Sequence, residues 1–237
     1  MPVRDRIELD ALPYALGAIG LGVASLISHD FAFQWQPVPA GIPARETLAL
    51  ASGALLVLGG LAAAWRGTGQ ARVILPGFYL LWAIALHIPV VLTAPTVGSL
   101  LGVAEILALA AGGSTLLWTR PPVATRILFG LCALVFGISH FVYADFTAQM
   151  VPGWIPVPLF WAYVTGVGHI AAGLAILTGI KGRLAATVEA AMCGTFVLLL
   201  HIPRVIAAPG SRFEWTMTFV ALSIAGAALL IRRSFPR

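Results

Sequence analysis

Hydrophobic positions along the chain gather into eight apolar runs, separated by short polar or charged segments. Each run approaches the ~20 residues that a helix needs to cross the hydrocarbon core of a bilayer. The pattern therefore predicts an all-α, polytopic membrane protein with eight transmembrane helices. The runs are 12–28, 46–65, 73–94, 98–119, 123–143, 157–180, 184–208 and 213–231.

Composition supports a membrane location. Hydrophobic residues make up 59% of the 237 residues, charged residues only 10%, and the mean hydropathy is +0.96. A soluble domain of this length does not need so much apolar surface, so we expect the lipid bilayer to be its main surrounding. The formal net charge is +5, but the basic residues are scattered between apolar runs and form no patch for nucleic acid.

The basic residues predict the orientation. Eleven of the fourteen fall on one side of the alternating helices, and Arg45, Arg204 and Arg212 fall on the other. Because cytoplasmic loops carry the excess of Lys and Arg, both termini are predicted to be cytoplasmic in a multi-pass protein of the cell inner membrane. The eleven are Arg4, Arg6, Arg66, Arg72, Arg120, Arg126, Lys181, Arg183, Arg232, Arg233 and Arg237.

One segment occurs twice. Residues 86–95 and 200–209 both read L-H-I-P-x-V-x-x-A-P, and the copies are 114 positions apart (200 minus 86). Ile27-Ser28-His29 and Ile138-Ser139-His140 also correspond. We therefore expect a tandem duplication, with a four-helix bundle in 1–122 and a second one in 123–237. An even number of helices in each half gives the halves the same orientation, which is a parallel repeat.

Ionisable side chains at membrane depth are the candidate functional residues, because lipid makes them costly. With the predicted orientation, the histidines lie in the outer half or near the middle of the bilayer. Arg204 follows His201 by one helical turn, whereas Val90 stands at the corresponding position of the first half. The candidate ligand-binding residues are His87, His201, Arg204, His140, His169 and Glu105.

The pattern leaves three interpretations of these histidines open. They can be structural donors to carbonyls that the prolines free. They can line a pocket for a quinone or another lipid-soluble ligand, with neutral imidazoles at its head group. A metal or haem site is less favoured, since no helix carries His-x-x-x-His or Glu-x-x-His. No catalytic residue and no metal ligand are assigned.

The remaining polar and aromatic residues suggest structural roles. Glu189 is expected near the cytoplasmic end of its helix, paired with Arg183 or Lys181. The thiols Cys132 and Cys193 are expected to be packed in helices. Tryptophans near the predicted helix ends are expected in the aromatic belts at the membrane surface; they are Trp35, Trp65, Trp118, Trp154 and Trp215.

The second half resembles the DoxX-like family of small membrane proteins. The resemblance rests on a loop of the form V-P-x-x-x-P at residues 151–156 and a T-G-x-x-x-x-x-x-G stretch at residues 165–173. It implies a four-helix membrane unit, here doubled. Some relatives are linked to a thiosulfate:quinone oxidoreductase as its small subunit and others to redox-stress membrane complexes, so the resemblance also implies a redox partner protein. It implies no catalytic residues.

We therefore expect an accessory membrane subunit of a redox system, without catalytic activity of its own, that holds a quinone or lipid in its outer half. Two alternatives remain. Parallel repeats with prolines near a polar residue are also typical of small-solute or ion transporters. A purely structural or assembly role is the third hypothesis.

Overall fold

The computed structural model describes residues 7–236, and its secondary structure there is helical apart from one isolated bridge between Ile7 and Trp65. It confirms the all-α membrane architecture, with eight helical segments long and apolar enough to span a bilayer. The first predicted helix, which has the shortest apolar run, is among them. The segments are Leu9–Ser28, Arg45–Ala64, Arg66–Thr93, Val97–Leu117, Val123–Val142, Pro158–Thr178, Gly182–Ala207 and Arg212–Ser234.

Five of the eight segments are built mainly on one long α-helix. These helices are α1 (Leu12–Ser28), α2 (Arg45–Ala64), α6 (Val123–Val142), α8 (Pro158–Thr178) and α11 (Arg212–Ile231). The fourth segment is α5 (Val97–Ser114) with a short 3₁₀ turn after it. A short helix that the sequence did not predict, α7 (Ala144–Met150), lies between α6 and α8.

The third and seventh segments are interrupted at corresponding places. In the third, α3 (Ile74–Trp82) continues as a π-helix over Ala83–His87 and then as α4 (Ile88–Thr93). In the seventh, α9 (Gly182–Phe196) continues as a π-helix over Val197–His201 and then as α10 (Ile202–Ala207). Both π-helices end at the repeated histidine, two residues before the proline. Pro cannot donate the backbone hydrogen bond that an α-helix needs, and the wider π turn absorbs that loss.

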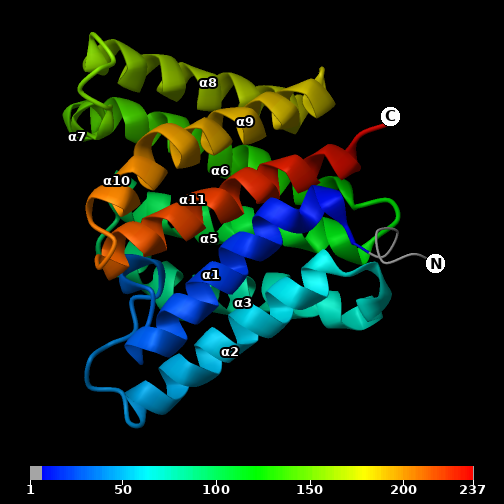
Figure 1. Cartoon of the computed structure of the whole chain (residues 1–237). Coiled ribbons are helices and arrows are strands. Elements are labelled where there is room, and N and C mark those ends of the chain that lie inside the picture. Colours follow the sequence, from blue (N-terminus) through cyan, green and yellow to red (C-terminus); the bar gives the residue numbers. More distant parts are fainter. Residues whose placement is uncertain (1–6, 237) are drawn as a thin grey trace.

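The two halves share one interior. Helix α1 packs on α2 of its own half and on α11 of the other half, while α6 packs on α8 and on α5. Helices α5 and α11 contact each other, and α11 crosses the middle of the molecule (Figure 1). The first helix of each half thus packs on the last helix of the other half. The contacts are thus arranged alike in the two halves, while the tandem duplication and its boundary at residue 122 stay predictions.

Close helix contacts in both halves depend on glycine. A Cβ on Gly22 of α1 would lie 2.5 Å from the carbonyl oxygen of Gly53 in α2. In the second half, a Cβ on Gly173 of α8 would lie 2.9 Å from the carbonyl oxygen of Gly130 in α6. Backbones approach this closely only where neither residue has a side chain, as in other membrane helix pairs.

Charged residues collect at the two ends of the bundle. At the predicted cytoplasmic end, Glu8 lies within 3.3 Å of Arg233, 3.4 Å of Arg66 and 3.7 Å of Arg72. The contact between Glu8 and Arg233 brings the beginning and the end of the described chain together at one end of the molecule. The side of the membrane that this end faces stays a prediction.

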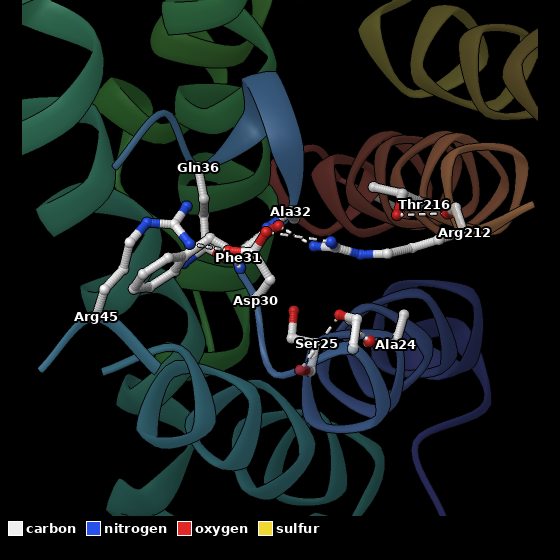
Figure 2. Close-up of polar contacts among 10 residues, drawn as sticks. Ala24, Ser25, Asp30, Phe31, Ala32, Gln36, Arg45, Arg212 and Thr216 are labelled. Carbon is white, nitrogen blue, oxygen red and sulfur yellow. Dashed lines mark hydrogen bonds and ion pairs between the residues drawn. The ribbon is translucent and has the colours of Figure 1, made fainter. Parts of the chain in front are cut away.

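At the opposite, predicted outer end, Asp30 joins three segments. Its carboxylate accepts hydrogen bonds from Arg45 at the start of α2 and from Arg212 at the start of α11, which approach from opposite sides (Figure 2). Partial burial raises the pKa of Asp30, but hydrogen bonds from the Phe31 backbone N–H and from both arginines outweigh it, so this pKa lies below its ordinary value. Asp30 is therefore an ionised clamp between the halves.

Candidate functional site

A cluster of three buried polar side chains lies between α8 and α9. Nδ1 of His169 is 2.7 Å from Oε1 of Glu189, and the side chains are 3% and 0% exposed. Sγ of Cys193, one helical turn after Glu189, is 3.9 Å from the same carboxylate oxygen. We call these three residues the buried triad. Its ligand-type atoms lie within 4.8 Å of one another.

The position of Glu189 corrects the sequence-based interpretation. Glu189 was expected to be an ordinary residue that pairs with Arg183 or Lys181, but it is fully buried and faces His169. Its second oxygen, Oε2, is buried and has no hydrogen-bond partner among the described residues. Glu189 and His169 are distant in sequence and meet only when α8 and α9 pack together. The one signal in the sequence was the spacing Glu-x-x-x-Cys, which places Glu189 and Cys193 on one helix face.

His140 adjoins the buried triad. Its ring centroid lies 4.9 Å from that of His169, and Phe136 and Phe196 pack around the two imidazoles. Nδ1 of His140 is 2.8 Å from the carbonyl oxygen of Phe136. Since a carbonyl only accepts, Nδ1 carries the proton, and Nε2 of the neutral ring keeps its lone pair. The structure thus brings the predicted residues His140 and His169 together.

The described part of the first half carries no such cluster. The positions that correspond to His169, Glu189 and Cys193 are Leu56, Leu75 and Tyr79, and all three are 0% exposed. Apolar and aromatic side chains therefore fill the same place between α2 and α3. Within residues 7–236, a triad of this kind occurs in the second half alone.

His87 and Glu105 belong to a separate network in the first half. Nε2 of His87 donates to the carbonyl oxygen of Trp35 at 3.0 Å, and the Trp35 indole N–H donates to Glu105 at 2.9 Å. Glu105, a candidate ligand-binding residue, thus has the indole of Trp35 as its hydrogen-bond partner. Trp35 was expected in the membrane-surface belt, yet it is only 5% exposed. These contacts anchor the loop between α1 and α2 to α5.

His201 differs from its repeat counterpart. It is 6% exposed, and its Nδ1 is buried without a hydrogen-bond partner among the described residues. Arg204, one turn further, places Nε 3.2 Å from a carboxylate oxygen of Glu214 in the first turn of α11. Arg204 therefore already has an anionic partner within the chain. His87 is held by a carbonyl, whereas His201 keeps an open hydrogen-bonding atom.

The six predicted residues thus fall into three groups. His140 and His169 meet at the buried triad, His87 and Glu105 are joined through Trp35, and His201 and Arg204 lie at the α10–α11 contact. Both cysteines are buried and free, as expected. The triad can share protons or ligate a cation, and His201 can donate to or accept from a ligand.

Comparison with known proteins gives one match. A family model described as "Domain of unknown function (DUF8561)" matches residues 129–207. The matched segment runs from α6 to the end of α10 and contains both the buried triad and His201. Neither the curated proteins nor the solved structures include one that matches the chain significantly.

Proposed function

We propose that this integral membrane protein is an accessory subunit of a membrane redox system and holds a quinone-class ligand beside His201. The observation that carries the proposal is the Nδ1 atom of His201, which is buried and has no hydrogen-bond partner in the part of the chain that the structure describes. A polar atom that is buried without a partner costs about 1–3 kcal/mol, so such atoms are rare unless a ligand or water satisfies them. The DoxX-like resemblance of this half favours a redox setting for that ligand.

The chemistry of the site suits a quinone head group. A neutral imidazole with its proton on Nδ1 donates a hydrogen bond to a quinone carbonyl, and the other tautomer accepts one from a quinol hydroxyl. The buried imidazole is followed along α10 by side chains that face outward, with Ile202 39% exposed and Ile206 74% exposed. These exposed aliphatic groups offer an apolar surface for an isoprenoid tail.

The difference between the two repeated histidines, His87 and His201, also supports a ligand site in the second half only. His87 satisfies the carbonyl of Trp35, so its role is structural. His201 has no corresponding bond to any described residue. One copy of a duplicated segment is thus tied into the scaffold, and the other is left open for a ligand.

Photolabelling with an azidoquinone tests the proposal. The protein, reconstituted in lipid nanodiscs, is irradiated with the probe, and labelled peptides are identified by mass spectrometry. We expect labelling in residues 197–219 that excess unlabelled quinone suppresses and that His201→Leu reduces at least fivefold. His29→Leu, which changes an exposed histidine at the same predicted end, is the matched control. Labelling that is equal in His201→Leu and wild type would contradict the proposal.

A transport function is the second candidate, and the paired helix interruptions favour it. The third and seventh segments each combine a π-helix with a proline at the same repeat position. Discontinuous helices at corresponding positions of two repeats mark the substrate path in many transporters. Proteoliposomes loaded with ions or small solutes test this candidate. Flux that Glu189→Gln abolishes would support it, and vesicles that stay tight to every solute would count against it and leave quinone binding or a purely structural role.

A further inference from the structure

The buried triad has the composition of a metal site. His169, Glu189 and Cys193 offer an imidazole nitrogen, a carboxylate oxygen and a sulfur, all within 4.8 Å of one another. Imidazole, thiolate and carboxylate together are typical of zinc and related divalent ions, whereas magnesium and calcium prefer oxygen ligands alone. The triad thus points to a borderline-soft metal.

The hydrogen bonds of the triad are incomplete without a further group. Glu189 is 0% exposed, its only ion-pair partner among residues 7–236 is His169, and its Oε2 has no hydrogen-bond partner there. Leaving a carboxylate oxygen unsatisfied in a membrane interior is costly. A cation bound between the carboxylate and the thiol satisfies that oxygen.

From these observations we propose that the buried triad binds one divalent ion of the zinc class. The ligands are Nδ1 of His169, the carboxylate of Glu189 and the thiolate of Cys193. Tetrahedral zinc with bond lengths of about 2.0–2.3 Å keeps its ligand atoms about 3.3–3.7 Å apart. The present separations from the Glu189 carboxylate oxygen, 2.7 Å to His169 and 3.9 Å to Cys193, lie on either side of this range, and all three ligand atoms lie within 4.8 Å of one another.

Charge balance selects a divalent ion. Without metal, the triad is neutral when Cys193 is a thiol and one further proton is shared between His169 and Glu189. Binding forms three metal–ligand bonds and releases these two protons, and the product contains one +2 ion, one carboxylate, one thiolate and a neutral imidazole. The net charge of the site stays at zero, which avoids the cost of an isolated charge inside the membrane.

Two further observations strengthen the assignment: the position of His140 and the residues at the corresponding place in the first half. Three protein ligands leave one tetrahedral position free, and the neighbouring ring of His140 keeps an Nε2 lone pair because its Nδ1–H is bound to the carbonyl of Phe136. A histidine oriented in this way by a carbonyl is a common feature of metal centres. The first half fills the corresponding place with Leu56, Leu75 and Tyr79, so packing in such a four-helix unit does not require the polar triad.

Metal analysis and cobalt substitution test the proposal on the full-length protein. We expect zinc near one equivalent per chain after gentle purification in detergent. We also expect titrated Co²⁺ to give visible d–d bands and a thiolate-to-cobalt charge-transfer band. Cys193→Ser should remove the charge-transfer band, and Glu189→Gln should weaken Co²⁺ binding at least about 100-fold, since loss of even a supporting contact costs about 10–100-fold.

The chain offers matched controls. Cys132→Ser changes the other buried thiol, and Glu105→Gln changes a half-buried carboxylate in α5 of the first half; both should keep wild-type metal content. If a triad variant fails to fold, the charge-transfer band of the wild-type protein still tests whether a thiolate binds the metal. A wild-type protein that takes up no cobalt, or a cobalt spectrum without that band, would overturn the proposal. Since His201 lies outside the triad, quinone labelling and metal content can fail independently.

Discussion

Nδ1 of His169 lies 2.7 Å from Oε1 of Glu189, and both side chains are buried between α8 and α9 of an eight-helix membrane protein. Breaking one member of a buried pair leaves the other uncompensated, at a cost of about 3–5 kcal/mol. In the first half, Leu56 and Leu75 occupy the corresponding positions. The first half therefore has two leucines at the positions that the His169–Glu189 pair occupies in the second half.

The first prediction follows from that comparison. His169→Leu should destabilise the protein by about 3–5 kcal/mol because it leaves Glu189 without its partner. The double variant His169→Leu/Glu189→Leu should recover most of this loss, since it recreates the apolar packing of the first half. Thermal unfolding of metal-free protein in detergent measures both. A double variant less stable than His169→Leu would show that the pair is not a compensated unit.

The second prediction separates the two repeated histidines. His87→Leu removes the donor to the Trp35 carbonyl and should cost about 1–3 kcal/mol of stability. His201→Leu removes a buried atom that has no hydrogen-bond partner among residues 7–236, so ligand-free protein should be unchanged or more stable. The measurement is the Tm of each variant compared with that of ligand-free wild type. An equal loss of Tm in both variants would contradict the different roles assigned to His87 and His201.

The third prediction concerns helix packing. Gly173→Ala places a Cβ 2.9 Å from the Gly130 carbonyl oxygen and should destabilise the α6–α8 contact by about 1–3 kcal/mol. Gly194→Ala, where a Cβ meets no atom within 4 Å, is the control. That change should stabilise α9 by about 0.5–1 kcal/mol through helix propensity. Chemical unfolding of both variants measures the difference, and a neutral Gly173→Ala would argue against close packing there.

The fourth prediction tests the orientation. Thr119 and Gly210 are exposed at opposite ends of the bundle, while both native cysteines are buried. An impermeant maleimide added to intact cells should label Gly210→Cys and leave Thr119→Cys unlabelled until the membrane is opened. The reverse pattern would place both termini outside.

The fifth prediction concerns pH. Because the Phe31 N–H, Arg45 and Arg212 hold the pKa of Asp30 below its ordinary value of 3.8, its ionisation favours the folded state. This stabilisation is present above that ordinary value and is lost as the pH falls through the lowered pKa of the folded protein. Asp30→Asn should therefore lower Tm at neutral pH, and the difference should shrink below about pH 4. Asp145→Asn, which changes an exposed carboxylate outside any ion pair of the described chain, should show neither effect.

The sequence predicted the spans well because hydropathy and bilayer thickness set their lengths. The repeated prolines, Pro89 and Pro203, lie just after the interruptions of the third and seventh segments, but the pattern did not predict the π-helices before them, since those depend on how each turn redistributes its backbone bonds. It misread Glu189 and Trp35 because their partners, His169 and Glu105, lie on other helices. The hydrophobic pattern predicts how deep in the membrane a residue lies. It does not predict the partner of a polar side chain, because that depends on how the helices pack.

Quinone extraction from protein purified gently out of its native membrane tests the central proposal most directly. We predict close to one quinone per chain in wild type and in His29→Leu, and less than a fifth of that amount in His201→Leu. Wild-type protein that carries no quinone above the lipid background, or a His201→Leu variant that retains it fully, would contradict the proposal.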